Sequence, residues 1–105
     1  MKIETDGAYG EPHIVCPYCD FEYVHPAKVR VYPVEGDLEW EITSKGPALR
    51  DSDAAKHQRG VTISITFFCE SGHSWESVFQ FHKGSTFFNV IEVKSDNDLD
   101  TLWRD

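Results

Sequence analysis

The sequence lacks any long apolar run. No stretch approaches the roughly 18 to 20 apolar residues that a helix needs to span a bilayer. The first residues, MKIETDGAYG, contain no apolar segment of the kind found in secretory signals. We therefore expect no membrane span, no signal peptide and a cytoplasmic location.

Positive charge is also scarce. The chain carries 10 Lys and Arg residues against 18 Asp and Glu residues, a formal net charge of -8. An acidic surface repels phosphate backbones, so general nucleic-acid binding is disfavoured, whereas binding to a basic partner is compatible with this charge. With 105 residues, 40% hydrophobic and 13% aromatic content, the chain is expected to fold as one domain over residues 1–105 rather than remain disordered.

Cysteine is rare, and its number is odd. Three cysteines do not build a disulfide framework, and a metal site in a reducing compartment fits them better. All three fall in two short motifs, CPYC over residues 16–19 and CESGH over residues 69–73, and strand-like runs flank both motifs.

The two motifs together supply four zinc ligands. These are Cys16, Cys19, Cys69 and His73. Zinc takes four ligands in a tetrahedral arrangement, and thiolate and imidazole groups bind it well. Because protein groups fill all four positions, the set predicts one structural Zn²⁺ ion, whereas a catalytic zinc would need an open position. His25 or His82 stays open as an alternative fourth ligand.

This pattern resembles the zinc-ribbon class, in which two knuckles at the ends of hairpins clamp one zinc ion, here in a small domain of bacterial or phage type. The resemblance covers residues 13–24 and 61–82. It implies that Cys16 and Cys19 form the first knuckle and that Cys69 and His73 form the second. The chain departs from the common pattern in its C-x3-H second knuckle and in the long insertion between the knuckles. It resembles no narrower family with a known function.

The CPYC motif also resembles the redox motif of glutaredoxins, where the cysteine pair opens a helix in a βαβ fold. Here the motif is followed by DFEYVHP over residues 20–26, which is aromatic, β-branched and ended by proline. These residues favour a strand over a helix, so a thiol-disulfide oxidoreductase is the less favoured interpretation. We expect no catalytic residues and no small-molecule substrate.

The hydrophobic pattern predicts a mainly β protein: an antiparallel sheet of about six to seven strands that incorporates the zinc ribbon at one end. Residues 38–43 and 61–67 alternate between apolar and polar, as half-buried strands do. Residues 75–82 and 86–93 form the arms of a hairpin, and 86–93 is apolar on both faces, which predicts a strand that is central or covered on both sides. The expected core is Val15, Phe21, Leu38, Trp40, Ile42, Val61, Ile63, Ile65, Phe67, Trp75, Phe79, Phe81, Phe88 and Val90.

Three segments lie outside this expected sheet. We expect a tail over residues 1–12, a long mobile loop over 44–60 and a short C-terminal helix over 95–105. The loop carries a basic excess in an acidic chain, and the helix would present Trp103. The candidate partner-binding residues are Lys45, Arg50, Lys56, Arg59, Lys83 and Trp103.

The leading functional hypothesis is a small structural-zinc domain that acts by binding another protein. The alternative is a zinc-ribbon nucleic-acid-binding protein that uses the basic residues of 45–59, with aromatic side chains near the first knuckle to stack bases. The partner itself and the oligomeric state do not follow from the sequence.

Overall fold

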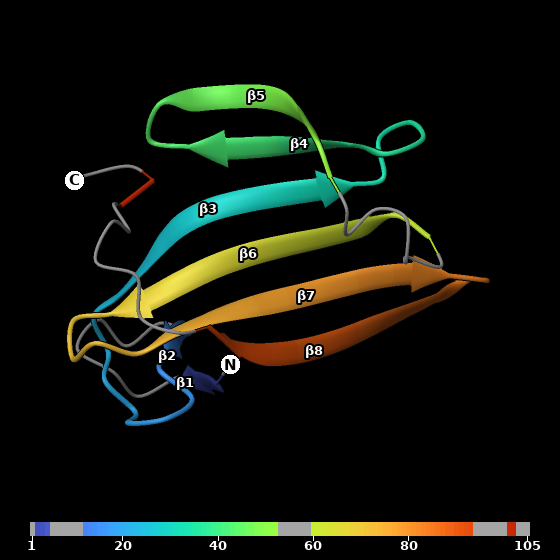
Figure 1. The fold of residues 1–105 in the computed structure, drawn as a ribbon. Coiled ribbons are helices and arrows are strands. Elements are labelled where there is room, and N and C mark those ends of the chain that lie inside the picture. The colour runs from blue at the N-terminus through green and yellow to red at the C-terminus, as the bar shows by residue number, and fades with distance from the viewer. Residues whose placement is uncertain (1, 5–11, 53–59, 94–100, 103–105) are drawn as a thin grey trace.

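The computed structural model describes residues 2–4, 12–52, 60–93 and 101–102 (Figure 1). Eight strands make up most of this part of the chain. They are β1 (Lys2–Glu4), β2 (His13–Val15), β3 (Val24–Tyr32), β4 (Leu38–Thr43), β5 (Gly46–Asp51), β6 (Thr62–Cys69), β7 (Ser74–His82) and β8 (Ser85–Val93). No helix occurs among the described residues, and so none that is long and apolar enough to cross a membrane.

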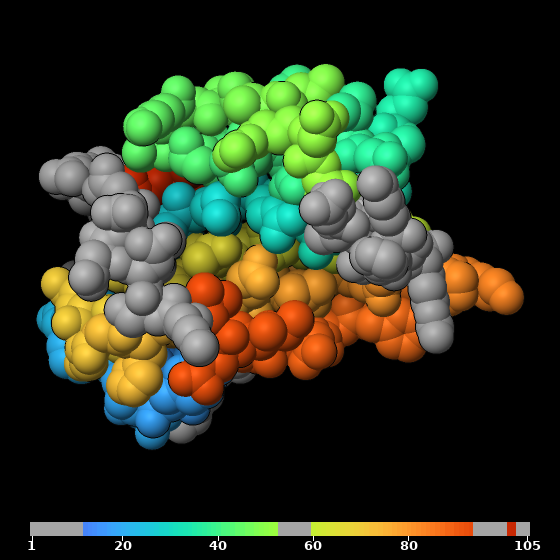
Figure 2. Space-filling view, viewed as in Figure 1, coloured from blue at the N-terminus to red at the C-terminus, as the bar shows by residue number. Residues whose placement is uncertain are grey.

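The strands form two antiparallel sheets (Figure 1). The larger sheet has six strands in the order β5-β4-β3-β6-β7-β8, and the smaller pairs β1 with β2. Two hairpin units, β3-β4-β5 and β6-β7-β8, meet along β3 and β6. The space-filling view shows β4–β5 and β7–β8 as two flanks with β6 recessed between them (Figure 2). This arrangement confirms the expected mainly β, antiparallel architecture.

Strand alternation gives the six-stranded sheet two chemically different faces. The apolar face carries Val29, Val31, Trp40, Ile42, Leu49, Ile63, Ile65, Phe67, Trp75, Phe79, Phe81, Phe88 and Val90. The polar face carries Arg30, Tyr32, Glu39, Glu41, Arg50, Thr62, Ser64, Thr66, Glu76 and Gln80. Contrary to the usual expectation, the residues of β6 that are most fully buried belong to the polar face: Thr62 and Ser64 are both 0% exposed.

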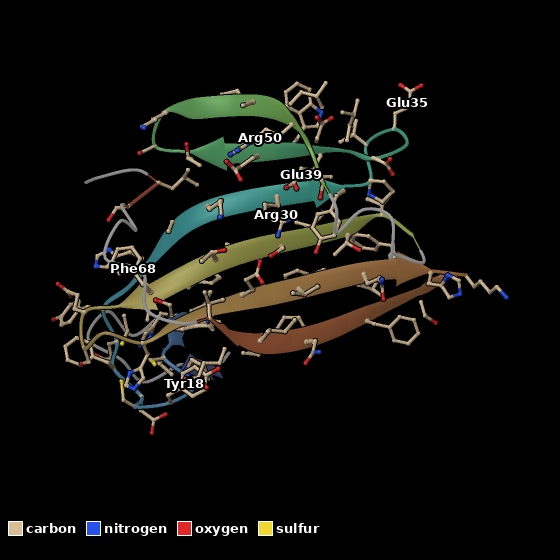
Figure 3. The ribbon with its side chains drawn as sticks, viewed as in Figure 1. Tyr18, Arg30, Glu35, Glu39, Arg50 and Phe68 are labelled. Atoms are coloured by element: carbon tan, nitrogen blue, oxygen red, sulfur yellow. The ribbon has the colours of Figure 1, made fainter. Side chains whose placement is uncertain are left out.

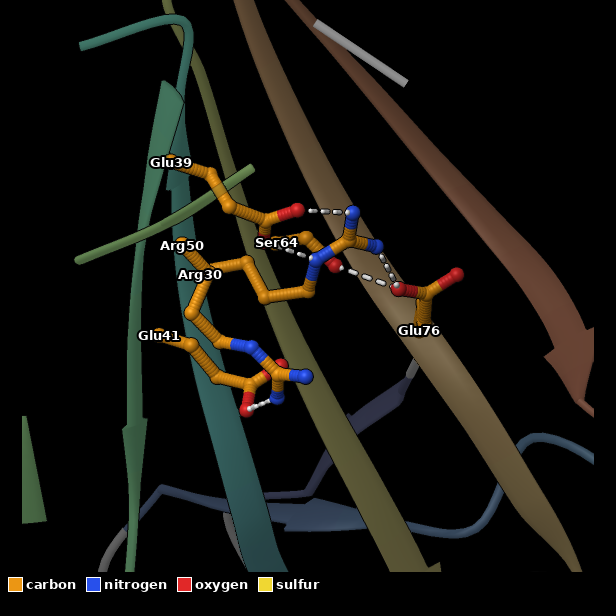
Figure 4. Close-up of polar contacts among 6 residues, drawn as sticks. All are labelled: Arg30, Glu39, Glu41, Arg50, Ser64 and Glu76. Atoms are coloured by element: carbon orange, nitrogen blue, oxygen red, sulfur yellow. Dashed lines mark hydrogen bonds and ion pairs between the residues drawn. The ribbon is translucent and has the colours of Figure 1, made fainter. Parts of the chain in front are cut away.

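Ion pairs and hydrogen bonds join the strands across the polar face (Figures 3 and 4). The Arg30 guanidinium donates to both carboxylate oxygens of Glu39, with N···O distances of 2.6 and 2.9 Å. The remaining guanidinium nitrogen, Nη1, lies 3.6 Å from Oε1 of Glu76. The same Glu76 oxygen accepts a 2.8 Å hydrogen bond from the Ser64 hydroxyl. The hydrogen bond from Arg30 lowers the pKa of Glu39 and more than offsets the opposing effect of burial. This network ties β3, β4, β6 and β7 together.

The hydrophobic core lies at one end of the apolar face. It contains Cys16, Phe67, Cys69 and Trp75, with Ile14, Val24, Ile65 and Val90 packed against it. Phe67 and Trp75 are stacked, with ring centroids 5.6 Å apart. Of the expected core residues, three are buried: Val15, Phe67 and Trp75. The prediction is wrong for five others, which are exposed: Phe21, Trp40, Val61, Phe81 and Phe88. The remaining six are half-buried.

Three other expectations differ from the structure or lie outside it. Residues 46–51, expected as part of a loop, form β5, because they pair with β4 from Leu38↔Asp51 to Thr43↔Gly46. The strand over 86–93, expected to be central or covered, is the edge strand β8. Of the expected tail, Lys2–Glu4 form β1, which pairs with β2. Most of the rest of the tail, most of residues 53–60 and nearly all of the C-terminal helix lie outside the described residues; near that terminus, the Leu102 N–H donates to the Pro26 carbonyl at 2.8 Å.

Candidate metal centre

The first knuckle follows directly from β2. The Cys16 N–H donates to the Phe21 carbonyl at 3.0 Å, and the Asp20 N–H donates to the Cys16 carbonyl at 2.9 Å. These bonds close the CPYC segment into a tight turn, which ends at Asp20 with a positive φ of 60°. Aspartate tolerates this left-handed conformation better than most residues. The turn brings both cysteines of the motif to one side.

The second knuckle is the hairpin turn between β6 and β7. The Cys69 N–H donates to the His73 carbonyl at 2.9 Å, and the Gly72 N–H donates to the Cys69 carbonyl at 3.0 Å. Gly72 has a φ of 100°, which glycine adopts without the steric cost that a side chain would bring. The C-x3-H spacing thus turns the chain back within one hairpin, with both side chains on the same side.

The two knuckles bring Cys16, Cys19, Cys69 and His73 together, with all four ligand atoms within 4.8 Å of one another. The Cys19 and Cys69 sulfurs are 3.8 Å apart, and the Cys69 sulfur lies 3.5 Å from His73 Nδ1. Zinc bonds of about 2.3 Å to sulfur and about 2.0 Å to nitrogen give tetrahedral S···S edges of about 3.8 Å and S···N edges of about 3.5 Å. The group is compatible with a zinc-binding site, with Nδ1 as the nitrogen ligand.

Burial and hydrogen bonding act differently on the two buried thiols. Burial raises the pKa of Cys16 to about 11, although N–H groups of Tyr18 and Cys19 act in the opposite direction. Burial also opposes ionisation of Cys69, but hydrogen bonds from His73 and from the Ser71 backbone outweigh it and lower the pKa of Cys69 to about 7. Of these two thiols Cys69 therefore ionises more readily, and a bound cation would favour ionisation of Cys16 as well.

Aromatic side chains enclose the cluster. The Tyr18 ring centroid lies 5.7 Å from that of His73 and 6.4 Å from that of Trp75, which is fully buried. The Glu70 N–H donates to the Tyr23 carbonyl at 3.2 Å and joins one knuckle to the segment after the other. Cys19, by contrast, is exposed. The aromatic rings thus shield the site from solvent on the side of the sheet, whereas the site is accessible to solvent at Cys19.

The alternative histidine ligands do not join the cluster. His25 lies 3.8 Å from a carboxylate oxygen of Glu70, and its ring packs on Phe68 at 5.2 Å. His82 ends β7, at the opposite end of that strand from the knuckle. Within the described residues, His73 is therefore the histidine that completes the set.

The CPYC motif sits in a knuckle after a β-strand, and the described residues that follow it enter β3 rather than a helix. The helix N-terminus that lowers thiol pKa values in redox enzymes is therefore not part of this site. Burial instead raises the pKa of Cys16, which disfavours it as a reactive thiolate. The geometry fits metal binding better than thiol-disulfide exchange.

The structure does not bring the candidate basic residues together. Lys45 lies in the β4–β5 turn and Lys83 in the β7–β8 turn; β4 and β7 run in opposite directions, so these turns lie at opposite ends of the sheet. Arg50 is on β5, where it donates to Glu41 at 2.6 Å. Lys56, Arg59 and Trp103 lie outside the described residues. The described part of the chain thus offers no single basic surface.

Sequence reasoning missed the ion-pair network of Arg30, Glu39 and Glu76. Its signal was present in the alternation of charged residues in β3, β4 and β7, but their pairing depends on which strands are neighbours.

Comparisons of the chain with protein-family models, with curated proteins and with solved structures found no match.

Proposed function

We propose that this chain is a structural-zinc β domain that acts by binding another protein. The zinc part rests on the Cys3His geometry. A bound ion would hold β2 and the first knuckle against the end of β6 and β7, and structural zinc sites of this kind contribute directly to folding. Reduced thiols are required for the site, in keeping with the expected cytoplasmic location.

The protein-binding part is carried by one observation, the exposed apolar face. On it Trp40, Leu49, Phe81 and Phe88 are 40–49% exposed. Among the described residues, the first knuckle packs on this face at the metal end, and these four side chains remain accessible. An exposed array of large apolar side chains on a sheet is typical of a surface that meets another protein.

The partner predicted by this surface has an apolar contact patch of its own, because between β4 and β7 the face carries no charged side chain. Aromatic anchors such as Trp40 are typical of the residues that dominate binding energy. The acidic charge of the rest of the chain would favour partners with a basic rim around that patch.

Binding is tested by affinity capture from a lysate of the source cells with the zinc-loaded chain, followed by titration of the purified partner. Trp40→Ser and Leu49→Ser should each weaken the measured affinity at least about tenfold, as expected for exposed anchors. Val34→Ser is the matched control, because Val34 is 42% exposed but lies between β3 and β4, off the face. Equal losses from all three variants, or from none, would remove this surface as the binding site.

A further inference from the structure

The two edges of the six-stranded sheet are protected differently. The β5 edge is six residues long and contains Pro47, which has no N–H to offer, and Arg50. Short edge strands with proline or charge resist pairing with another chain. The β8 edge is nine residues long, contains no proline, lysine or arginine, and has seven exposed residues. The β8 edge is therefore open for strand addition.

β8 also has the side chains of an interior strand. Phe87, 52% exposed, and Ile91, 45% exposed, lie on the side of the polar face, whereas Phe88, 46% exposed, lies on the apolar face. Large apolar side chains on a strand gain contacts from same-face side chains of each neighbouring strand. Among the described residues β8 has one such neighbour, β7, so the other edge leaves these side chains without a cross-strand pair.

One hydrogen bond identifies the backbone groups that face outward. The Val90 N–H donates to the Asn89 side-chain oxygen at 2.9 Å rather than to β7. Since inward and outward groups alternate along a strand, the outward residues are Thr86, Phe88, Val90 and Glu92. Among the described residues these groups make no ladder bond to another strand, and the bond of the Val90 N–H to the Asn89 side chain is local.

We propose that β8 pairs with β8 of a second copy of this chain, antiparallel and about a two-fold axis at Asn89. The pairing joins two six-stranded sheets into one continuous sheet. Antiparallel pairing of identical strands is closed by a two-fold axis and uses the same surface on both copies. The dimer uses the backbone edge of β8 rather than the apolar face of the proposed function, and Phe88 borders both surfaces.

Side-chain complementarity selects this register. Centred on Asn89, it places Phe88 opposite Val90 and Phe87 opposite Ile91, so apolar side chains meet on both faces. The one charged residue of β8, Glu92, then lies opposite Thr86, and no like charges face each other. A register centred on Val90 would instead place Phe88 opposite Glu92, and one centred on Phe88 would place Phe87 opposite Asn89.

A second copy fits this edge better than a charged peptide. β8 carries a single charge, so it offers little electrostatic attraction to a charged strand, whereas its own sequence supplies the matching apolar pairs. Like-charge repulsion between two acidic chains is small at this edge for the same reason. The pairing also gives each Phe88 and Phe87 a cross-strand neighbour about 5 Å away.

The first test is sedimentation equilibrium of the zinc-loaded protein. We expect a mass twice the 12.0 kDa of the chain. Val90→Pro should give a monomer, because it removes an outward N–H that makes no bond to β7. Ala48→Lys, a change at an exposed position of β5 on the opposite edge, should leave the dimer intact. Unchanged zinc content in Val90→Pro verifies that the variant is folded. A wild-type monomer at all concentrations, or a Val90→Pro dimer, would overturn the proposal.

The second test is register-specific cross-linking with zinc bound to the native thiols. At Asn89 the two copies form a non-hydrogen-bonded pair, whose Cα atoms are about 4.5 Å apart, within the range that a disulfide bridges. Asn89→Cys should therefore cross-link rapidly to a covalent dimer under mild oxidation. Phe87→Cys alone and Ile91→Cys alone should not, whereas a mixture of those two should. Equal cross-linking at all three positions, or none at 89, would contradict the register.

Discussion

The two ends of the apolar face behave as different kinds of surface although they are built from similar residues. At the metal end, Phe67 and Trp75 are buried beneath the first knuckle. Farther out, Trp40 and Phe88 are more than 40% exposed on the same face of the sheet. What differs is the cover: a short segment anchored by the cysteine cluster lies over one end and does not reach the other. Stability is therefore expected to be concentrated at the metal end, and recognition at the open end.

The largest effect should come from removing a ligand. Cys69→Ser should abolish stoichiometric zinc binding and unfold the metal end, because structural zinc in small sites contributes on the order of 10 kcal/mol. Elemental analysis and near-ultraviolet circular dichroism measure the two consequences. Ser71→Ala, an exposed change in the same turn, is the control and should retain both. A Cys69→Ser protein with full zinc content and native dichroism would contradict the assigned cluster.

The next effect compares two tryptophans on one face. Trp75→Ala should lower the free energy of unfolding by about 3 to 5 kcal/mol, since it empties a buried site in the core. Trp40→Ala, at a position 41% exposed, should cost less than about 1 kcal/mol. Denaturant unfolding of the zinc-loaded proteins measures both. Similar losses for the two variants would mean that the open end of the face is covered in solution.

A smaller effect is expected on the polar face. Glu39→Gln should lower the free energy of unfolding by about 2 kcal/mol at neutral pH, because it leaves the half-buried Arg30 guanidinium with a weaker acceptor. Glu41→Gln, whose partner Arg50 is 59% exposed, should cost at most about 0.5 kcal/mol. The same unfolding assay separates these values, and equal costs would remove the special role of the Arg30–Glu39 pair.

The Glu39 contribution should also depend on pH. Its pKa in the folded protein lies below the ordinary value of 4.5, so the charged form stabilises the fold above that value. This stability is lost as pH falls through the folded pKa. The difference between wild type and Glu39→Gln should therefore be constant near neutrality and shrink below about pH 4.5. Zinc loss in acid affects both proteins and cancels in the comparison; a difference that grows in acid would contradict the assignment.

The smallest effect should come from the histidine outside the cluster. His25→Ala removes only an exposed contact to Glu70 and packing on Phe68, so zinc affinity should stay within about twofold of wild type. His73→Ala, in contrast, should weaken it at least about tenfold. Competition with a chromophoric chelator measures both affinities. Equal weakening would reassign the fourth ligand.

Much of the metal end could be predicted from the sequence because its information is local. Cysteine pairs at fixed short spacing, Gly72 before the last ligand and flanking alternation in 61–67 define two knuckles without any knowledge of the fold. The side of the sheet that would be covered could not be predicted in this way. Alternation marks Trp40 and Phe88 as belonging to an apolar face, but whether that face meets another layer depends on how many segments are left to cover it.

The same limit applies to β5 and to the ion-pair network. Residues 46–51 contain glycine, proline and charge and no β-branched residue, so propensity alone favours a loop. Pairing with β4 overrides that preference. The Arg30–Glu39 pair follows from the neighbouring positions of β3 and β4 in the sheet, which no spacing in the sequence encodes.

X-ray absorption at the zinc edge of the purified protein tests the central claim, a Cys3His clamp, most directly. The account predicts one zinc per chain with three sulfur neighbours at about 2.3 Å and one nitrogen at about 2.0 Å. A metal-free folded protein, or zinc bound mainly by oxygen and nitrogen, would contradict it.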